Sequence, residues 1–547
     1  MRLKALPWVL GLGVGLGAAA SAGGCALVLG LDEFVDAPPD AGTTGAGAPC
    51  QPGETQPCYG GPDGTEGIGL CREGQRACVD GVWAETCEGE VTPRAEDCTS
   101  PGDEDCDGAG CSETFWAKIF GDGASQSGMV VAADASGGVI VAGATDGTVD
   151  FGGGPLIAAG GGDVFVARFD RTGKHAWSKR FGDANEQVVT AVAVDAAGNV
   201  FLSGYFEGSV DFGGGPLTSA VNTDVFLAKL DPRGQHVWSE RYGSSIRAQE
   251  PSGLAIGPDG HLVLVGSFWD TIDFGGGELS SEGDSDVFTA KLDSTTGAQI
   301  WAKSFGDPSV QQASAVDVDA SGNIVMAGSF GGAVSFGGAA LTTGSASLYN
   351  MYVVKLDTLG NHAWSKQYGD GSGHQRPTAV KFNASGEVIV AGEFAHSINF
   401  GGAQFVATNG HYDIYVAKLS SSGQHVWSRK FGGAFVDRRP RIALNSSSDL
   451  FITCQFEDAI DFGGGNLPNN GPFDIAVARL DPAGQHVWSR SFGDVDRGLR
   501  SQFPWGIAGA PTDDAVFITG QQFGTVDYGQ GSLAAAEDDI FVLSLAP

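Results

Sequence analysis

The chain has 547 residues, and its 65 acidic against 31 basic side chains give a formal net charge of −34 at pH 7. This length exceeds a single ordinary core, so several domains or an array of repeats is expected. The acidic balance argues against nucleic-acid binding, because neutralising phosphates needs a basic face. Hydrophobic residues make up 42% of the chain, which excludes a disordered glycine-rich polymer.

The N-terminal stretch predicts export. Arg2 and Lys4 precede an apolar run over 5–20, which is short for a membrane span and suits a secretory signal peptide. The residues leading to Cys25, Ser-Ala-Gly-Gly-Cys, resemble a bacterial lipobox, in which the cysteine is diacylated and becomes the mature N-terminus. We therefore expect a signal peptide over 1–24 and a lipid on Cys25. The alternative is plain secretion with cleavage near Ala20 or Ala22.

The lipobox resemblance also implies a location. The residue after the cysteine is Ala26, and not the Asp that holds enteric lipoproteins at the inner membrane. The expected address is therefore the outer membrane, on its periplasmic or outer side. Residues 25–49 carry the anchor and are typical of a flexible tether, because 32–49 is rich in Pro, Gly, Ala and Thr without hydrophobic periodicity.

Residues 50–111 form a predicted disulfide-rich module. An even number of cysteines in an exported segment too small for a good core indicates four disulfides, and sequence alone leaves 105 pairings open. A zinc site is disfavoured, because this segment has neither a CxxC pair nor a histidine. The eight cysteines are Cys50, Cys58, Cys71, Cys78, Cys87, Cys98, Cys106 and Cys111.

An acidic loop closes this module. Asp103, Asp105 and Asp107 alternate along the chain before Gly108, and converging oxygens on a sharply turning loop suit Ca²⁺. The segment resembles the Cys-rich metal-binding repeats of myxobacterial and related surface proteins, which carry a similar DxDCDG ending. This resemblance implies a Ca²⁺ site at the three aspartates. The other interpretation is a solvated acidic turn, since no bidentate Glu stands where an EF-hand needs one.

A repeated motif dominates the rest of the chain. GQHVWSERYG at 234–243 has near-copies throughout, and seven tryptophans recur 61 to 63 residues apart. They are Trp116, Trp177, Trp238, Trp301, Trp364, Trp427 and Trp488. Such regular self-similarity indicates a repeat architecture.

Each repeat contains four short strand patterns. In the second repeat they lie at 189–195, 200–206, 224–231 and 236–243, rich in β-branched and aromatic residues and bounded by Gly, Asp, Asn and Pro. Four-stranded units repeated radially make a β-propeller. The array begins with an orphan fourth strand at 115–121 and stops after an orphan third strand at 539–545. These two segments are predicted to pair, which closes a ring of seven blades over 113–547.

The units resemble the bacterial SBBP β-propeller repeat. The pattern D-hydrophobic-V-A-K-L-D-x-x-G-x-x-x-W is matched at 224–238, and I-A-V-D-x-x-G-N at 191–199. The resemblance implies an all-β propeller and says little about function, because that family is largely uncharacterised.

Several repeated polar residues invite functional interpretations. The histidines before the tryptophans lie on five different blades and are interpreted as strand packing. The aspartates at the first hairpin turn and before the third strand are interpreted as structural. The DFGGG segments are interpreted as tight bends with a buried aromatic ring, and Cys454 as a buried free thiol. No GxSxG, HExxH, P-loop or dinucleotide fingerprint is present.

Arginines in the connectors between blades are the least repetitive feature. Four connectors after a Trp strand carry Arg, and such connectors border the axial opening of a propeller. Arg binds carboxylates bidentately, so a site for an anionic or hydroxyl-rich ligand is predicted in the blade 5–7 sector. Its residues are Arg376, Arg438, Arg439, Arg497, Arg500 and Gln502. The alternative is local pairing of these arginines with neighbouring aspartates.

The expected function is a non-catalytic, envelope-anchored lipoprotein whose propeller serves as a binding or scaffold domain. The expected partners are the membrane, through the lipid, and a glycan, an anionic surface ligand or a protein. No cofactor is required, and Ca²⁺ in the Cys-rich module is the one candidate. The alternatives are a carbohydrate-active enzyme, which would need two carboxylates across one cleft, and a structural subunit of an envelope complex.

Overall fold

The computed structural model describes residues 50–94 and 114–546, apart from 63, 69, 221, 244–246, 344–347, 370, 372, 495–500 and 512–514. The predicted signal peptide, Cys25, the tether and the acidic loop lie outside the described residues. So do Cys98, Cys106, Cys111, Arg497 and Arg500. Residues 50–60 and 73–90 belong to one compact unit, and the repeats form the second.

The Cys-rich unit is held by a small sheet and disulfides. Its strands β1 (Thr55–Cys58), β2 (Gly74–Val79) and β3 (Val82–Trp83) pair in the order β1-β2-β3. Cys50 is bonded to Cys78 and Cys58 to Cys87, and Cys71 is also disulfide-bonded. The prediction of a disulfide framework is confirmed for these five cysteines.

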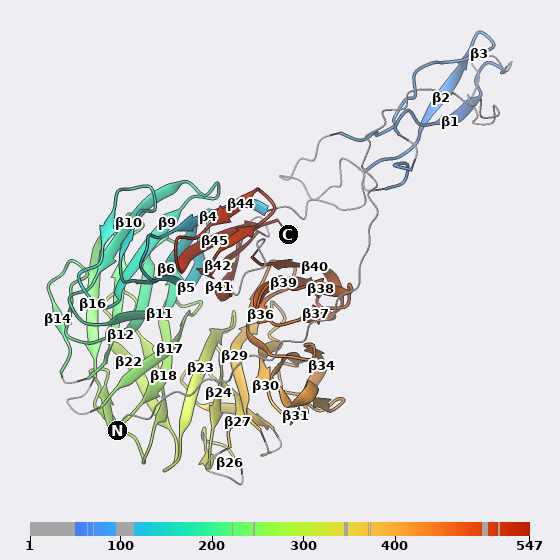
Figure 1. The fold of residues 1–547 in the computed structure, drawn as a ribbon. Coiled ribbons are helices and arrows are strands. Elements are labelled where there is room, and N and C mark those ends of the chain that lie inside the picture. Colours follow the sequence, from blue (N-terminus) through green and yellow to red (C-terminus); the bar gives the residue numbers. More distant parts are fainter. Residues whose placement is uncertain are drawn as a thin grey trace, which may run out of the picture. The chain divides into compact units, whose positions relative to one another are not determined.

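The repeats fold into seven four-stranded antiparallel sheets arranged as blades around an axis (Figure 1). The first strands are β5 (Gln126–Ala133), β11 (Gln187–Val194), β17 (Gln249–Ile256), β23 (Gln311–Val318), β29 (Gln375–Phe382), β35 (Asp437–Leu444) and β41 (Phe503–Gly509). The second strands are β6 (Val139–Thr145), β12 (Val200–Phe206), β18 (Leu262–Phe268), β24 (Ile324–Phe330), β30 (Val388–Phe394), β36 (Leu450–Phe456) and β42 (Val516–Gln522).

The third strands are β9 (Asp163–Phe169), β15 (Asp224–Leu230), β21 (Asp286–Leu292), β27 (Asn350–Leu356), β33 (Asp413–Leu419), β39 (Asp474–Leu480) and β45 (Asp539–Leu545). The fourth strands are β10 (His175–Phe181), β16 (His236–Tyr242), β22 (Gln299–Phe305), β28 (His362–Tyr368), β34 (His425–Phe431), β40 (His486–Phe492) and β4 (Thr114–Phe120). Blade 1 contains β5, blade 2 contains β11, and so on to blade 7, which contains β41.

A two-stranded hairpin joins the second and third strands of every blade. The hairpins are β7 (Thr148–Val149) with β8 (Leu156–Ile157), β13 (Ser209–Val210) with β14 (Leu217–Thr218), β19 (Thr271–Asp273) with β20 (Glu278–Ser280), β25 (Ala333–Val334) with β26 (Leu341–Thr342), β31 (Ser397–Ile398) with β32 (Phe405–Val406), β37 (Ala459–Asp461) with β38 (Asn466–Pro468), and β43 (Thr525–Asp527) with β44 (Ser532–Ala534). A 3₁₀ turn, η1 (Thr408–Gly410), follows β32.

The predicted ring closure is confirmed. β4 pairs antiparallel with β45 and completes blade 7, in the order β4-β45-β42-β41. The first strands contact one another around the ring, and β41 contacts β5. The second and third strands are almost wholly buried, because each blade is covered on both faces by its neighbours.

The DFGGG segments form the predicted bends. Phe151 is 2% exposed, and the Asp150 carboxylate accepts the backbone N–H groups of Gly152 and Gly154 at 2.7 and 3.0 Å. The aspartate therefore shapes the bend, and the bend places the ring between blades. Cys454 is buried and free, as predicted.

The repeated tryptophans clip neighbouring blades together. The indole N–H of Trp177 donates to the carbonyl of Pro232, in the last turn of the next blade, at 3.0 Å. Gly234 in that turn has φ +74°, and a Cβ there would lie 2.8 Å from the Trp177 ring. Glycine is therefore required both by the left-handed backbone and by the close approach of the ring.

Trp116 makes this clip across the closure. Its indole N–H donates to the Arg171 carbonyl of blade 1 at 3.1 Å, and its ring packs between Phe169 and Phe517. In the described part of the chain, the buried indole N–H of Trp488 has no acceptor. The reason is that blade 7 has no turn between its third and fourth strands, which are the two ends of the repeat array.

We expect Trp116→Ala to destabilise the ring, because it removes a buried aromatic side chain and the indole clip between blades 7 and 1. Loss of a buried Trp costs about 3–5 kcal/mol. Urea unfolding followed by far-UV circular dichroism should show a lower midpoint. Trp116→Phe retains most of the packing and should lose about 1 kcal/mol. Equal midpoints for Trp116→Ala and the unmodified chain would contradict this role.

Candidate functional site

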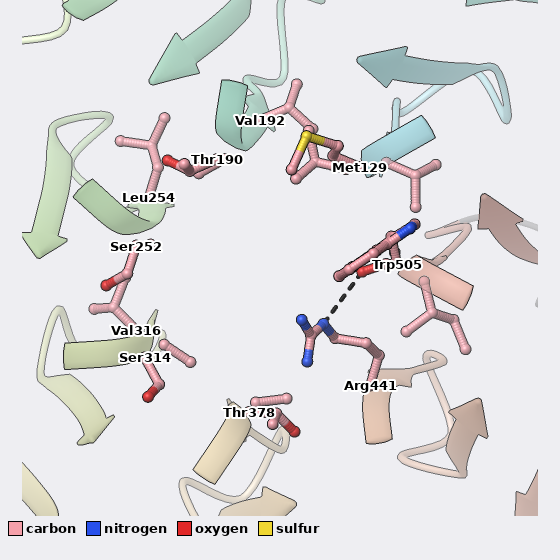
Figure 2. A pocket seen from close by; sticks show the side chains of 18 of the residues that line it. Met129, Thr190, Val192, Ser252, Leu254, Ser314, Val316, Thr378, Arg441 and Trp505 are labelled. Carbon is pink, nitrogen blue, oxygen red and sulfur yellow. Dashed lines mark hydrogen bonds between the residues drawn. The ribbon is translucent and has the colours of Figure 1, made fainter. Parts of the chain in front are cut away.

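The candidate site lies where the seven first strands meet. They enclose a cavity of about 330 Å³ on the ring axis, to which every first strand contributes (Figure 2). Each first strand begins next to the connector from the preceding Trp strand, so the connectors border one end of this channel. We call this the connector end.

A buried glutamine fixes the start of six of the seven first strands. The side chain of Gln311 donates to the carbonyl of Gly331 at 3.2 Å and accepts the backbone N–H of Asp307 at 3.0 Å. It thereby ties the connector to the end of the second strand. The six residues are Gln126, Gln187, Gln249, Gln311, Gln375 and Gln502.

The prediction that Gln502 lines the ligand site is therefore wrong. Gln502 is 0% exposed, and its amide nitrogen donates to the Phe523 carbonyl at 2.9 Å. A polar side chain buried at this position must be hydrogen-bonded to the framework. The signal that identifies it is the recurrence of Gln at the same place in six repeats.

Blade 6 departs from this pattern at its first strand. Asp437 replaces the glutamine, and the register between β35 and β36 shifts between Arg438 and Arg441, which leaves Arg439 and Pro440 unpaired. In blade 5 the corresponding shift leaves only Thr378 unpaired. The wider irregularity gives blade 6 a local backbone found in no other blade of the described ring.

Arg439 adopts a left-handed backbone in this irregular segment. Its φ is +55°, a conformation that costs a non-glycine residue about 1–2 kcal/mol. The Arg439 backbone N–H donates to Oε2 of Glu393 on β30 at 3.1 Å. Glu393 is 6% exposed, so this bond to a buried carboxylate helps to hold the strained turn.

Two guanidinium groups rest on aromatic rings beside this turn. The Arg438 guanidinium carbon lies 4.4 Å from the Tyr412 ring centroid. The guanidinium carbon of Arg439 lies 4.2 Å from the Trp505 centroid and 5.5 Å from that of Phe503. These are cation–π distances. Among the described residues, no carboxylate oxygen lies within 4.0 Å of either guanidinium group, and Nε of Arg438 is buried without a partner.

The structure brings Arg376 to the same end of the channel. Arg376 is exposed and is the second residue of β29, as Arg438 is of β35. Equivalent positions on neighbouring blades lie on the same end of the ring, so these two side chains and Arg439 share the connector end. Burial lowers the pKa of Arg439, and the nearby Arg438 charge lowers it further, against the opposing charge of Glu393.

Arg441 lies deeper, in the channel wall. Its Nε donates to the Trp505 carbonyl at 3.2 Å (Figure 2). Burial, together with the charge of Arg439, lowers its pKa to about 10, against the effect of Glu393. The residues predicted from the sequence for the ligand site did not include Arg441. Nor did the sequence indicate Phe503 and Glu393, whose positions carry unrelated residues in other repeats.

The aspartates that begin the third strands are framework residues. Asp163 is 0% exposed, accepts the backbone N–H of Ala159 at 2.7 Å and pairs with Arg180. In blade 3, Asp286 has no basic partner in the described chain, and burial raises its pKa to about 6. The structural interpretation is supported, but these residues start strands and anchor the preceding loop; they do not occupy turns.

The repeated histidines are also structural. Nε2 of His236 lies 3.1 Å from the hydroxyl oxygen of Ser239, three residues later on the same strand. In the part of the chain that the structure describes, no three His, Cys, Asp or Glu side chains are grouped to hold a metal ion. The predicted Ca²⁺ ligands Asp103, Asp105 and Asp107 lie outside that part. No helix within the described ranges has the length and apolarity needed to cross a bilayer.

Comparison with known proteins gives partial matches. No family model matches the chain. It is 26% identical over 201 residues to an uncharacterised WD repeat-containing protein of Acanthamoeba polyphaga mimivirus, covering 31% of this chain and 14% of that protein. It is 26% identical over 223 residues to the regulatory protein FlaEY of Caulobacter vibrioides, covering 39% of this chain and 23% of that protein. The chain thus spans less than a quarter of these relatives.

Solved structures also align with much of this chain, with TM-scores below 0.5. The WD40 domain of Neurospora crassa Pan2 matches 78% of this chain and 90% of its own, with 10% identity and a TM-score of 0.38. Quinohemoprotein alcohol dehydrogenase from Comamonas testosteroni matches 78% of this chain and 76% of its own, with 11% identity and a TM-score of 0.38. The chain's own sheet topology makes it an all-β, seven-bladed propeller.

We expect Asp437→Gln, which installs the residue of the other blades, to stabilise the protein above neutral pH. Burial raises the pKa of Asp437 to about 7, and Asp413 adds to this effect. A carboxyl whose pKa is higher in the folded than in the unfolded state stabilises the folded state fully below its unfolded-state pKa, near 4. This stabilisation is lost as pH rises through 7. A tenfold difference in acid dissociation constant between the folded and unfolded states corresponds to about 1.4 kcal/mol.

The measurement is the urea midpoint of both proteins at pH 5 and pH 8. The advantage of Asp437→Gln over the unmodified chain should be larger at pH 8. Asp286→Asn is the matched comparison, since blade 4 carries Asn350 there, and it should show the same trend through a lower pH range. A difference between variant and unmodified chain that is independent of pH would contradict the assignment.

Proposed function

We propose that this protein is a lipid-anchored envelope protein whose propeller is a non-catalytic binding domain for an anionic, hydroxyl-rich ligand at the connector end of blades 5 to 7. The observation that carries the proposal is the pair of guanidinium groups of Arg438 and Arg439. They are held on aromatic rings and left without carboxylate partners in the described chain, although the whole chain carries a charge of −34.

The chemistry of this surface favours an anionic glycan. Arginine can bind a carboxylate through two parallel N–H groups, and exposed Arg376 supplies a further donor at the same end. Tyr412, Phe503 and Trp505 offer flat apolar faces beside the arginines. A uronic-acid polymer combines carboxylates with pyranose rings that pack on aromatic groups.

Binding is favoured over glycoside hydrolysis. Hydrolysis needs two carboxylates across one cleft. The carboxylate placed beside the described arginines is Glu393, and its Oε2 already accepts the Arg439 backbone N–H. In this proposal Glu393 is a support for the turn and has no catalytic role.

The proposed anchor is the diacylated Cys25, with 25–49 as the tether. Two acyl chains give stable membrane attachment. Anchoring at the outer membrane would present the propeller to envelope polysaccharides, which are abundant polymers with carboxylate groups.

Arg438→Ala combined with Arg439→Ala should weaken binding of the whole purified chain to immobilised polygalacturonate. Each desolvated charge-assisted contact is worth about 1.5–3 kcal/mol, so the loss should be at least about tenfold. The matched control is Arg171→Ala with Arg233→Ala, which removes the same charge from exposed hairpin turns. Neutral dextran should bind weakly to all three proteins.

Two results would contradict this proposal. One is the absence of binding to any member of a glycan and peptidoglycan array that includes uronic-acid polymers. The other is an equal loss of binding in the hairpin-turn control, which would reduce the effect to net charge.

The anchor is tested separately by the mass of the mature N-terminal peptide. It should begin at Cys25 and carry acyl chains, and its processing should be sensitive to globomycin. Cys25→Ser should release the protein from membranes. An unmodified Cys25 that follows a new N-terminus near Ala20 or Ala22 would instead establish plain secretion.

A further inference from the structure

The wall of the axial channel is almost uncharged. Of the residues that line the cavity, only Lys381 and Arg441 carry charge, and both are cations. Nζ of Lys381 lies 3.4 Å from Oδ1 of Asp317, so this charge is paired. Among the described residues of the wall, Arg441 is therefore the cation that has no carboxylate oxygen within 4.0 Å. The described channel wall thus carries an unpaired positive charge, although the chain as a whole is acidic.

Arg441 is incompletely satisfied where it stands. Its Nε donates to the Trp505 carbonyl at 3.2 Å, and Nη1 lies 3.5 Å from the Pro440 carbonyl oxygen. Figure 2 shows the end of the guanidinium group reaching into the open channel. An ionised group surrounded by protein is costly unless it is paired. An anion on the channel side would complete its hydrogen bonding.

Two collars of side chains divide the channel along its axis. In six of the seven blades the unpaired residue at the register shift lines the cavity, and four of these residues are hydroxyls on consecutive blades. This polar collar consists of Met129, Thr190, Ser252, Ser314, Thr378 and Trp505. The Thr190 hydroxyl contacts the second-strand carbonyl of Ser203 at 3.4 Å. The Thr378 hydroxyl contacts that of Ala391 at 3.5 Å and also lies against the Pro440 carbonyl oxygen of blade 6.

The second collar is wholly aliphatic. It lies two residues further along each first strand and consists of Val131, Val192, Leu254, Val316, Val380, Ile442 and Ile507. Val380 and Ile442 are 1% and 3% exposed and pack within the blade cores, so the other five branched side chains provide the surface that favours an apolar group over water. The channel is therefore polar and cationic toward the connector end and apolar toward the other end.

We propose that the axial channel binds a small amphipathic organic anion, with its carboxylate on Arg441 and the hydroxyls of the polar collar and its apolar body inside the aliphatic collar. The cavity of about 330 Å³ lies within the range of small-molecule sites. This site adjoins the surface of Arg438 and Arg439, with which it shares Trp505, but the proposal does not rest on the proposed glycan binding.

The probes are acetate, hexanoate, benzoate and hexanol, each titrated calorimetrically into the whole chain at low ionic strength. Hexanoate and benzoate should bind. Affinity should rise from acetate to hexanoate by about fourfold for each methylene group buried, and hexanol should bind at least tenfold more weakly than hexanoate.

Arg441→Ala should weaken hexanoate binding at least tenfold. Alanine is native at the equivalent position of blade 5, Ala379, so the variant should fold. The matched control is Arg233→Ala, which removes the same single positive charge from an exposed hairpin turn outside the channel. Hexanoate affinity in this control should stay within twofold of the unmodified chain.

A second variant keeps the proposal testable if Arg441→Ala fails to fold. Ser314→Asp places a carboxylate in the polar collar and should abolish hexanoate binding by repulsion. The proposal is overturned if no carboxylate binds at ligand concentrations that reach about 20-fold above the protein concentration and extend into the millimolar range. Fragments of this size are expected to bind in that range. It is also overturned if acetate binds as tightly as hexanoate, which would mean an adventitious ion only, or if Arg441→Ala binds hexanoate normally.

Discussion

Pairing of β4 with β45 is the constraint on which the rest of this propeller depends. The two strands are more than 400 residues apart in the chain, and their ladder runs from Thr114 opposite Leu545 to Phe120 opposite Ile540. Without it, β45 would expose an edge to other chains, and blade 7 would lack its Trp clip to blade 1. The axial channel exists only because closure brings β41 against β5.

The framework is carried by residues that recur from blade to blade. A buried Gln ties the connector in six blades, an Asp or Asn starts each third strand, and a Trp stands on each fourth strand at the boundary with the next blade. These groups bury polar atoms only where hydrogen bonds compensate their desolvation. Their identity from blade to blade explains why they offer no specificity.

The candidate binding residues lie where the repeat pattern is broken. Blade 6 replaces the Gln by Asp437, loses one further strand pair at the register shift and places Arg439 in a left-handed backbone. The strain persists because Glu393 and the stack on Trp505 hold the turn on both sides. The same irregularity directs Arg438 and Arg439 to the connector end and Arg441 into the channel. Because these positive charges repel one another, an anion bound at one of these places would lower the repulsion on the arginine at the other.

The sequence by itself determined the period, the four strands of each repeat, the number of blades and the partner of the orphan strand at 115–121. These features are encoded locally, by alternation of side chains and by turn residues, and they recur seven times. Tertiary structure alone decided which side chains converge. The recurrence of Gln in six repeats marks Gln502 as a framework residue, whereas the direction of Arg441 into the channel depends on the register of β35 against β36. A register shift of one residue reverses the face that a side chain occupies, and the linear sequence carries no direct mark of that shift.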